Sequence, residues 1–153
     1  MPAWAGDLGI ALPSVLSAAG ELPMAGPPLN FFGSDTYHMA SLIGTYEYLL
    51  YSGDMDFFAC HWAHVRHTIA FVTDKLDRAS GALYVTGTGD WGRYAHGGLN
   101  TAANAMMFRT LITGAWMAGW QGDPVLAARW EEMADTLKAS VNSPTYNWDP
   151  TGG

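Results

Sequence analysis

The chain has 153 residues, of which 49% are hydrophobic and 14% charged, so it has ample material for a core and too little charge for disorder. Its formal net charge is −7 at pH 7, and the first 65 residues carry six carboxylates and no basic side chain. Because a phosphate backbone is held by clustered cations, this balance argues against nucleic acid as a partner and favours a neutral or cationic ligand.

The length and the cysteine content limit the possible architectures further. The length suits one domain or a piece of a larger one, and the single Cys60 allows no internal disulfide and no CxxC metal site. No apolar stretch approaches the ~20 residues of a membrane span, and the opening MPAWAGDLGI lacks the positive segment of a secretory signal. We expect a soluble chain without a membrane partner, and its localisation is not predicted.

Two helices are expected in the first half of the chain, over residues 36–52 and roughly 55–76. In both, apolar side chains recur at intervals of three and four residues, which is the period of an amphipathic helix. The repeating positions are Met39, Leu42, Ile43, Tyr46, Leu49 and Leu50, then Phe58, Trp62, Val65, Ile69, Val72 and Leu76.

The second half begins with GALYV at 81–85, which is long enough only for a brief extended segment. A glycine-rich stretch, TGTGDWGRYAHGGLN, follows at 86–100. Two further helices are expected near 100–120 and 124–142. The apolar positions of the last one are Leu126, Trp130, Met133, Leu137 and Val141.

A glycine followed by an aspartate joins the helices of each pair, at Gly53-Asp54 and again at Gly122-Asp123. The glycine is suited to end one helix in a left-handed conformation, and the aspartate to cap the next. Such short connections make neighbouring helices antiparallel. The sequence therefore predicts two helical hairpins.

The two helices of each hairpin differ in charge. Residues 36–52 carry only Glu47 and residues 100–120 only Arg109, whereas their partners carry several charges on one face. A helix that is apolar all round is buried, and one with a single apolar stripe lies outside. The pattern predicts an all-α fold of alternating inner and outer helices, as in a double-ringed α/α toroid whose loops surround a pocket. A plain helical repeat array is the alternative.

Two patterns suggest a cofactor or a metal, but each has a simpler interpretation. GTGDWG at 87–92 matches GxGxxG, yet Asp90 occupies the place of the pyrophosphate, so we treat the match as chance. His61, His64 and His67 lie within one third of a helix circumference, but on an outer helix they are better explained as a solvated face. We predict no cofactor and no metal.

Three carboxylates lie in glycine-rich or polar loops, namely Asp7, Asp35 and Asp90. Each could simply cap a helix, and Asp35 is well placed to do so, whereas the glycines that flank Asp90 begin no helix. A carboxylate beside a flat aromatic ring is the combination that holds a sugar, because the acid accepts from hydroxyls while the ring covers C–H groups. The accompanying aromatic residues are Trp4, Trp91 and Tyr94.

Four segments of the chain together resemble the six-hairpin glycosidases, most closely the catalytic domain of α-L-rhamnosidase-type glycoside hydrolases. They are WAGDLGIALPS, LPMAGPPL, SDTYHMASLIGTYEYLLYSGDMDFF and YVTGTGDWGRYAHGGLNTAANAMMFRTL. The resemblance extends from about Trp4 to Asp149. It implies an (α/α)6 toroid and hydrolysis of terminal α-L-rhamnosyl linkages by inversion, in which one carboxylic acid protonates the leaving oxygen and a second carboxylate activates water.

The resemblance also implies roles for individual residues. Its WxGD motif matches Trp4 and Asp7, which would hold the sugar, and its GDW motif matches Asp90 and Trp91, which would form part of the sugar platform. The aspartate at the head of the next inner helix matches Asp35. The glycines of 86–100 would then let the backbone approach a sugar closely. Residues expected at the rim, or behind these sugar contacts, are Tyr37, His38, Arg93 and His96.

The catalytic residues themselves are not assigned. In the family the general acid lies in an Arg- and acid-rich motif before WxGD, and the general base in a later hairpin. Neither is matched within residues 1–153, so we expect a single, partial six-hairpin domain that is inactive alone and self-associates through exposed helix flanks.

Two other functions compete with this interpretation. The chain could be a non-catalytic helical-hairpin module that binds carbohydrate or a partner protein. It could also belong to another six-hairpin hydrolase, such as an unsaturated glycuronyl hydrolase. The substrate of that enzyme is anionic, and a chain with no Lys or Arg before Arg66 is a poor host for it.

Overall fold

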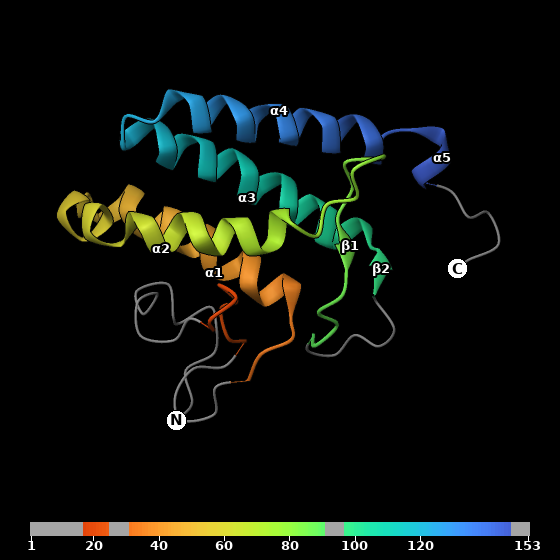
Figure 1. Cartoon of the computed structure of the whole chain (residues 1–153), viewed down its shortest axis with the longest axis horizontal. Coiled ribbons are helices and arrows are strands. Elements are labelled where there is room, and N and C mark those ends of the chain that lie inside the picture. Colours follow the sequence, from red (N-terminus) through yellow and green to blue (C-terminus); the bar gives the residue numbers. More distant parts are fainter. Residues whose placement is uncertain (1–16, 25–30, 91–96, 148–153) are drawn as a thin grey trace.

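The computed structural model describes residues 17–24, 31–90 and 97–147, and helices make up most of these residues (Figure 1). The all-α prediction is confirmed. The elements in chain order are α1 (Asp35–Ser52), α2 (Met55–Thr73), β1 (Tyr84–Val85), β2 (Gly98–Leu99), α3 (Thr101–Trp120), α4 (Pro124–Val141) and the short α5 (Pro144–Asn147).

The four long helices lie where the apolar periodicity predicts them, with one difference. α2 ends at Thr73, three residues before the expected end, because the chain then leaves the helix and Leu76 forms an antiparallel bridge with Leu83. The extended segment expected at 81–85 is present as β1, which pairs with β2. Within the described residues, no helix combines the length and the apolar character that crossing a membrane requires.

Both glycine-aspartate connections have the predicted geometry. Gly53 has a φ of 65°, and its N–H donates to the Leu49 carbonyl, which closes α1. Asp54 accepts from the Phe57 N–H at the start of α2, and Asp123 caps α4 in the same way. The helices of each pair are therefore antiparallel neighbours, and the prediction of two hairpins is confirmed.

Burial also alternates between the helices as predicted. α1 and α3 pack against each other, and both bury polar as well as apolar side chains around much of their circumference. Both begin on the side of the molecule that carries β1 and β2 (Figure 1). α2 and α4 bury only one stripe each, formed by Phe58, Val65, Thr68, Ile69 and Val72 in α2 and by Trp130, Ala134 and Leu137 in α4.

The core depends on a close approach at Gly114 in the middle of α3. A Cβ atom there would lie 3.0 Å from Ile69 Cδ1 of α2 and 3.2 Å from Trp130 Cε3 of α4. The absence of a side chain lets both outer helices contact the α3 backbone closely. Trp130 also meets the edge of Trp62 on α2, with ring centroids 6.2 Å apart, so the two outer helices touch through their indoles.

Two glycines of α3 provide a matched test of this packing. Gly119→Ala is expected to raise the free energy of unfolding by about 0.5 kcal/mol, because nothing lies within 4 Å of the added methyl and alanine favours the helix. Gly114→Ala is expected to lower it by about 1 kcal/mol, because its methyl overpacks against Ile69 and Trp130. Urea unfolding measures both, and equal gains would contradict the close approach.

Candidate functional site

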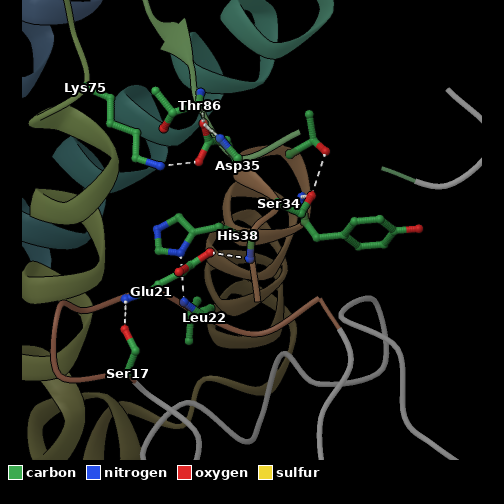
Figure 2. Close-up of polar contacts among 12 residues, drawn as sticks. Ser17, Glu21, Leu22, Ser34, Asp35, His38, Lys75 and Thr86 are labelled. Carbon is green, nitrogen blue, oxygen red and sulfur yellow. Dashed lines mark hydrogen bonds and ion pairs between the residues drawn. The ribbon is translucent and has the colours of Figure 1, made fainter. Parts of the chain in front are cut away.

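Three separate segments converge on the amino-terminal end of α1, where the polar residues of the candidate site gather. They are residues 17–24, residues 31–34 and the segment 86–90 that follows β1 (Figure 2). Loop backbone that packs against a helix needs hydrogen-bond partners for its N–H and C=O groups. The side chains at this end of α1 supply those partners.

Asp35, the first residue of α1, is fully buried and is the centre of this network. One carboxylate oxygen lies 2.5 Å from Lys75 Nζ, and the other accepts from the Thr86 and Gly87 N–H groups, both at 3.0 Å. The Asp35 N–H donates to the Gly87 carbonyl at 3.0 Å. We call this group of Asp35, Lys75, Thr86 and Gly87 the Asp35 clamp (Figure 2).

Positively polarised groups surround the Asp35 carboxylate. Asp35 lies in the first turn of α1, where the helix dipole stabilises negative charge. Lys75 supplies the counter-charge, and its ammonium lies 4.3 Å from the centroid of the Phe71 ring, which limits its contact with water. Removing one partner of a buried ion pair costs about 3–5 kcal/mol, because the other charge is left buried without compensation.

The clamp changes the interpretation of Asp35. Asp35 does not cap α1, because Ser34 precedes the helix and its Oγ accepts from the Tyr37 N–H at 3.2 Å. The capping interpretation of Asp35 is therefore wrong. The sugar contact expected of Asp35 stays a prediction, and its position is unfavourable for it, since both carboxylate oxygens are bonded within the protein and the residue is 0% exposed.

The same contacts explain two glycines of the segment after β1. A Cβ atom at Gly87 would lie 2.7 Å from Asp35 Oδ1, and one at Gly89 would lie 2.9 Å from the Gly33 carbonyl oxygen. The Gly89 N–H donates to that same carbonyl at 2.8 Å. Close packing against the start of α1 therefore accounts for these two glycines, whereas the sequence suggested the close approach of a sugar.

Asp90 comes directly after this packed segment and is partly buried. It lines a small hollow of about 140 Å³ between the first two turns of α1 and Met106 in the second turn of α3. We call this hollow the mouth pocket, and its lining consists of Thr36, Tyr37, Ala40, Asp90 and Met106. A carboxylate and a phenol ring beside methyl and thioether groups can hold a ligand that has both hydroxyl and C–H surfaces.

His38, in the first turns of α1, points into the protein interior and does not lie at the rim of the mouth pocket. It is 0% exposed, Nδ1 accepts from the Leu22 N–H at 3.0 Å, and Nε2 bonds to the Thr68 carbonyl at 2.8 Å. Since a carbonyl can only accept, Nε2 carries the proton and the ring is neutral. This burial disagrees with a position of His38 at the rim, and its expected role behind the sugar contacts stays a prediction. The Glu21 carboxylate adds a bond to the Gly33 N–H at 2.7 Å.

The other predicted site residues divide into two groups. On α2, His64 and His67 are exposed and His61 is partly exposed, in agreement with the solvated-face interpretation. Among the residues that the structure describes, no group of three or more His, Cys, Asp or Glu side chains is arranged to hold a metal. The predicted positions that lie outside the described residues are Trp4, Asp7, Trp91, Arg93, Tyr94 and His96.

Two residues of this region were missed by sequence reasoning. Lys75 looks like one of several surface charges of the second helix, but it pairs with a residue 40 positions away. The buried Asn104 of α3 accepts from the Leu83 N–H at 2.7 Å and donates to the Leu83 carbonyl at 3.1 Å, so its amide pairs with the backbone just before β1. No local pattern marks either residue, because both partners are distant in the chain.

No family model matches the chain, and no curated protein matches it. The relation to six-hairpin glycosidases therefore stays a prediction.

The buried His38 predicts a pH dependence of stability. Burial, opposed in part by the Thr68 carbonyl and Asp35, lowers the pKa of His38 from 6.5 to about 4. Between these values the unfolded chain binds a proton that the folded chain does not. As the pH falls from 6.5 to 4, the free energy of unfolding should therefore decrease by about 3 kcal/mol from this residue.

Denaturant unfolding at several pH values measures this dependence. His38→Gln should remove this part of the slope even if the variant is less stable throughout. His64→Gln, which changes an exposed histidine of α2, should leave the slope unchanged. The same slope in wild type and His38→Gln would contradict the assignment.

Proposed function

We propose that this chain forms part of an (α/α)6 catalytic domain of the α-L-rhamnosidase type and that it binds the terminal deoxy-sugar of a rhamnosylated glycan or glycoside. In the proposed ring, α1 and α3 belong to the inner circle, and α2 and α4 to the outer one. Support comes from the alternation of more and less buried helices and from the common direction of α1 and α3. Closure of the ring is part of the proposal.

The observation that carries the proposal is the meeting of Asp90 and Tyr37 at the mouth pocket. They are 53 positions apart in the sequence, yet they line one hollow where the two sheltered helices begin. Asp90 would accept from sugar hydroxyls, and the ring of Tyr37 would face the C–H groups. By the resemblance, Trp4, Asp7 and Trp91 complete the site, with Arg93 and His96 near its rim.

The proposal assigns binding to this chain, and assigns no acid or base for hydrolysis to any of its residues. Inverting hydrolysis requires a carboxylic acid and a carboxylate about 6.5–9.5 Å apart, with the sugar between them. Asp35 is a poor candidate for either role, because its oxygens are held by Lys75, Thr86 and Gly87. We therefore expect no release of nitrophenol from an aryl α-L-rhamnoside by this chain alone.

Titration calorimetry with L-rhamnose tests the binding function. Asp90→Asn should weaken the affinity at least tenfold, because a hydrogen bond to a charged group is worth about 1.5–3 kcal/mol. Asp77→Asn is the matched control, since Asp77 is an exposed carboxylate that bonds to Ser80 in a different turn. The proposal fails if wild type does not bind L-rhamnose or if Asp90→Asn binds it equally well.

D-glucuronate serves as the anionic comparison in the same titrations. Tighter binding of D-glucuronate than of L-rhamnose would favour the glycuronyl hydrolase alternative.

A second candidate function is that of a non-catalytic module that associates through an exposed apolar surface. Where α1 and α3 end and α2 begins, Leu50, Met55 and Trp120 share a hollow of about 290 Å³. The rings of Trp116 and Trp120 both contact the ring of Tyr46. Trp116 and Trp120 are each about two fifths exposed. Exposed apolar patches of this kind promote association with other proteins.

Size-exclusion chromatography at increasing protein concentration tests this surface. Leu50→Ser should shift the elution toward the monomer if the surface drives self-association. Leu99→Ser is a matched control, because Leu99 is equally exposed but lies in β2, at the opposite end of α3. A wild-type chain that elutes as a monomer at every concentration would count against self-association.

A further inference from the structure

The Asp35 clamp lies beside the mouth pocket without lining it. Asp35 is fully buried, whereas the next residue along α1, Thr36, belongs to the pocket lining. On the other side of the clamp, Gly87 precedes Asp90 by three residues. The clamp therefore joins the start of α1 and the segment that ends in Asp90, which both contribute to the pocket lining, and neither of its charged groups needs to touch a ligand to affect it.

Backbone bonds set the register between these two segments. The Asp35 N–H donates to the Gly87 carbonyl, Ser34 and Thr88 form an antiparallel bridge, and the Gly89 N–H donates to the Gly33 carbonyl at 2.8 Å. The last of these bonds ends one residue before Asp90. The position of the Asp90 backbone is therefore determined by how the segment lies against the start of α1.

The Asp35 carboxylate also binds the segment 86–89, through hydrogen bonds from its backbone N–H groups. Asp35 Oδ2 accepts from two consecutive N–H groups, those of Thr86 and Gly87, and Oδ1 is bonded to Lys75 Nζ (Figure 2). Bonds to an ionised acceptor are stronger than neutral ones. Without Lys75, the buried negative charge would keep the two amides but lose its counter-ion.

We propose that Asp35 and Lys75 are positioning residues for the saccharide site: by fixing residues 86–89 against α1, they hold the Asp90 carboxylate toward the mouth pocket. The inference rests on the proposed sugar-binding function and gives Asp35 a role through Asp90 in place of the direct sugar contact. Lys75, a residue with no assigned part in binding, becomes a determinant of affinity.

Amide hydrogen exchange followed by NMR tests the effect on the segment. In Lys75→Met, exchange at Thr86, Gly87 and Gly89 should be at least tenfold faster than in wild type. The Leu83 amide, which Asn104 holds independently, should exchange at an unchanged rate. Lys75→Arg, which keeps the positive charge, should restore slow exchange. Unchanged exchange at the three amides, or an equal rise at Leu83, would overturn the proposal.

Asp35→Asn provides a second variant in case Lys75→Met does not fold. It keeps the shape of the side chain but removes the charge, and the same three amides should exchange faster. Lys138→Met, which removes an exposed lysine of α4, is the control for the loss of a positive charge and should leave exchange at these amides as in wild type.

Affinity for L-rhamnose separates positioning from a merely structural role. Lys75→Met should bind L-rhamnose at least tenfold more weakly, and adding Asp90→Asn should cause little further loss, because both changes act through the same carboxylate. Fully additive losses, or an unchanged affinity in Lys75→Met, would overturn the positioning role. If wild type does not bind L-rhamnose at all, the saccharide role fails with the proposed function, and the exchange rates still decide whether the clamp orders residues 86–89.

Discussion

The buried carboxylate of Asp35 is the interaction on which this end of the molecule depends. A charge with no exposure to water is tolerated only if its hydrogen bonds and its counter-charge are all provided. Here they come from two places in the chain: Lys75 just after α2, and the consecutive amides of Thr86 and Gly87 after β1. The contacts of this one side chain therefore fix the positions of both segments relative to the start of α1.

Hydrophobic packing and hydrogen bonding stabilise different parts of the structure. The helices are arranged by apolar contacts, with α1 and α3 sheltered and with Gly114 allowing α2 and α4 to approach closely. The loops contribute some apolar contacts, such as those of Leu22 and Leu83 with the core, but they are also held by hydrogen bonds to the buried side chains of Asp35, His38 and Asn104. The mouth pocket lies where helix packing and the polar network meet, and its lining includes both apolar side chains, Ala40 and Met106, and the carboxylate of Asp90.

Features that depend on neighbouring residues could be predicted from the sequence, and those that depend on distant partners could not. The four long helices and both glycine-aspartate turns follow from local periodicity and capping chemistry. The cap of α1 could not be decided from the sequence, because Ser34 and Asp35 are both good capping residues; in the structure the Ser34 side chain caps the helix. The roles of Lys75 and Asn104 are invisible in the sequence, since their partners lie 40 and 21 positions away.

The distance along the chain between Asp35 and its amide donors has a consequence for the order of folding. The bond from Gly87 to the carboxylate spans 52 positions, and the whole of α2 lies between them. The first hairpin can therefore form from local contacts, but the start of α1 acquires its donors only after the chain has passed β1. We therefore expect the contacts of Asp35 to form late in folding, and to couple the first hairpin to the strand that precedes the second.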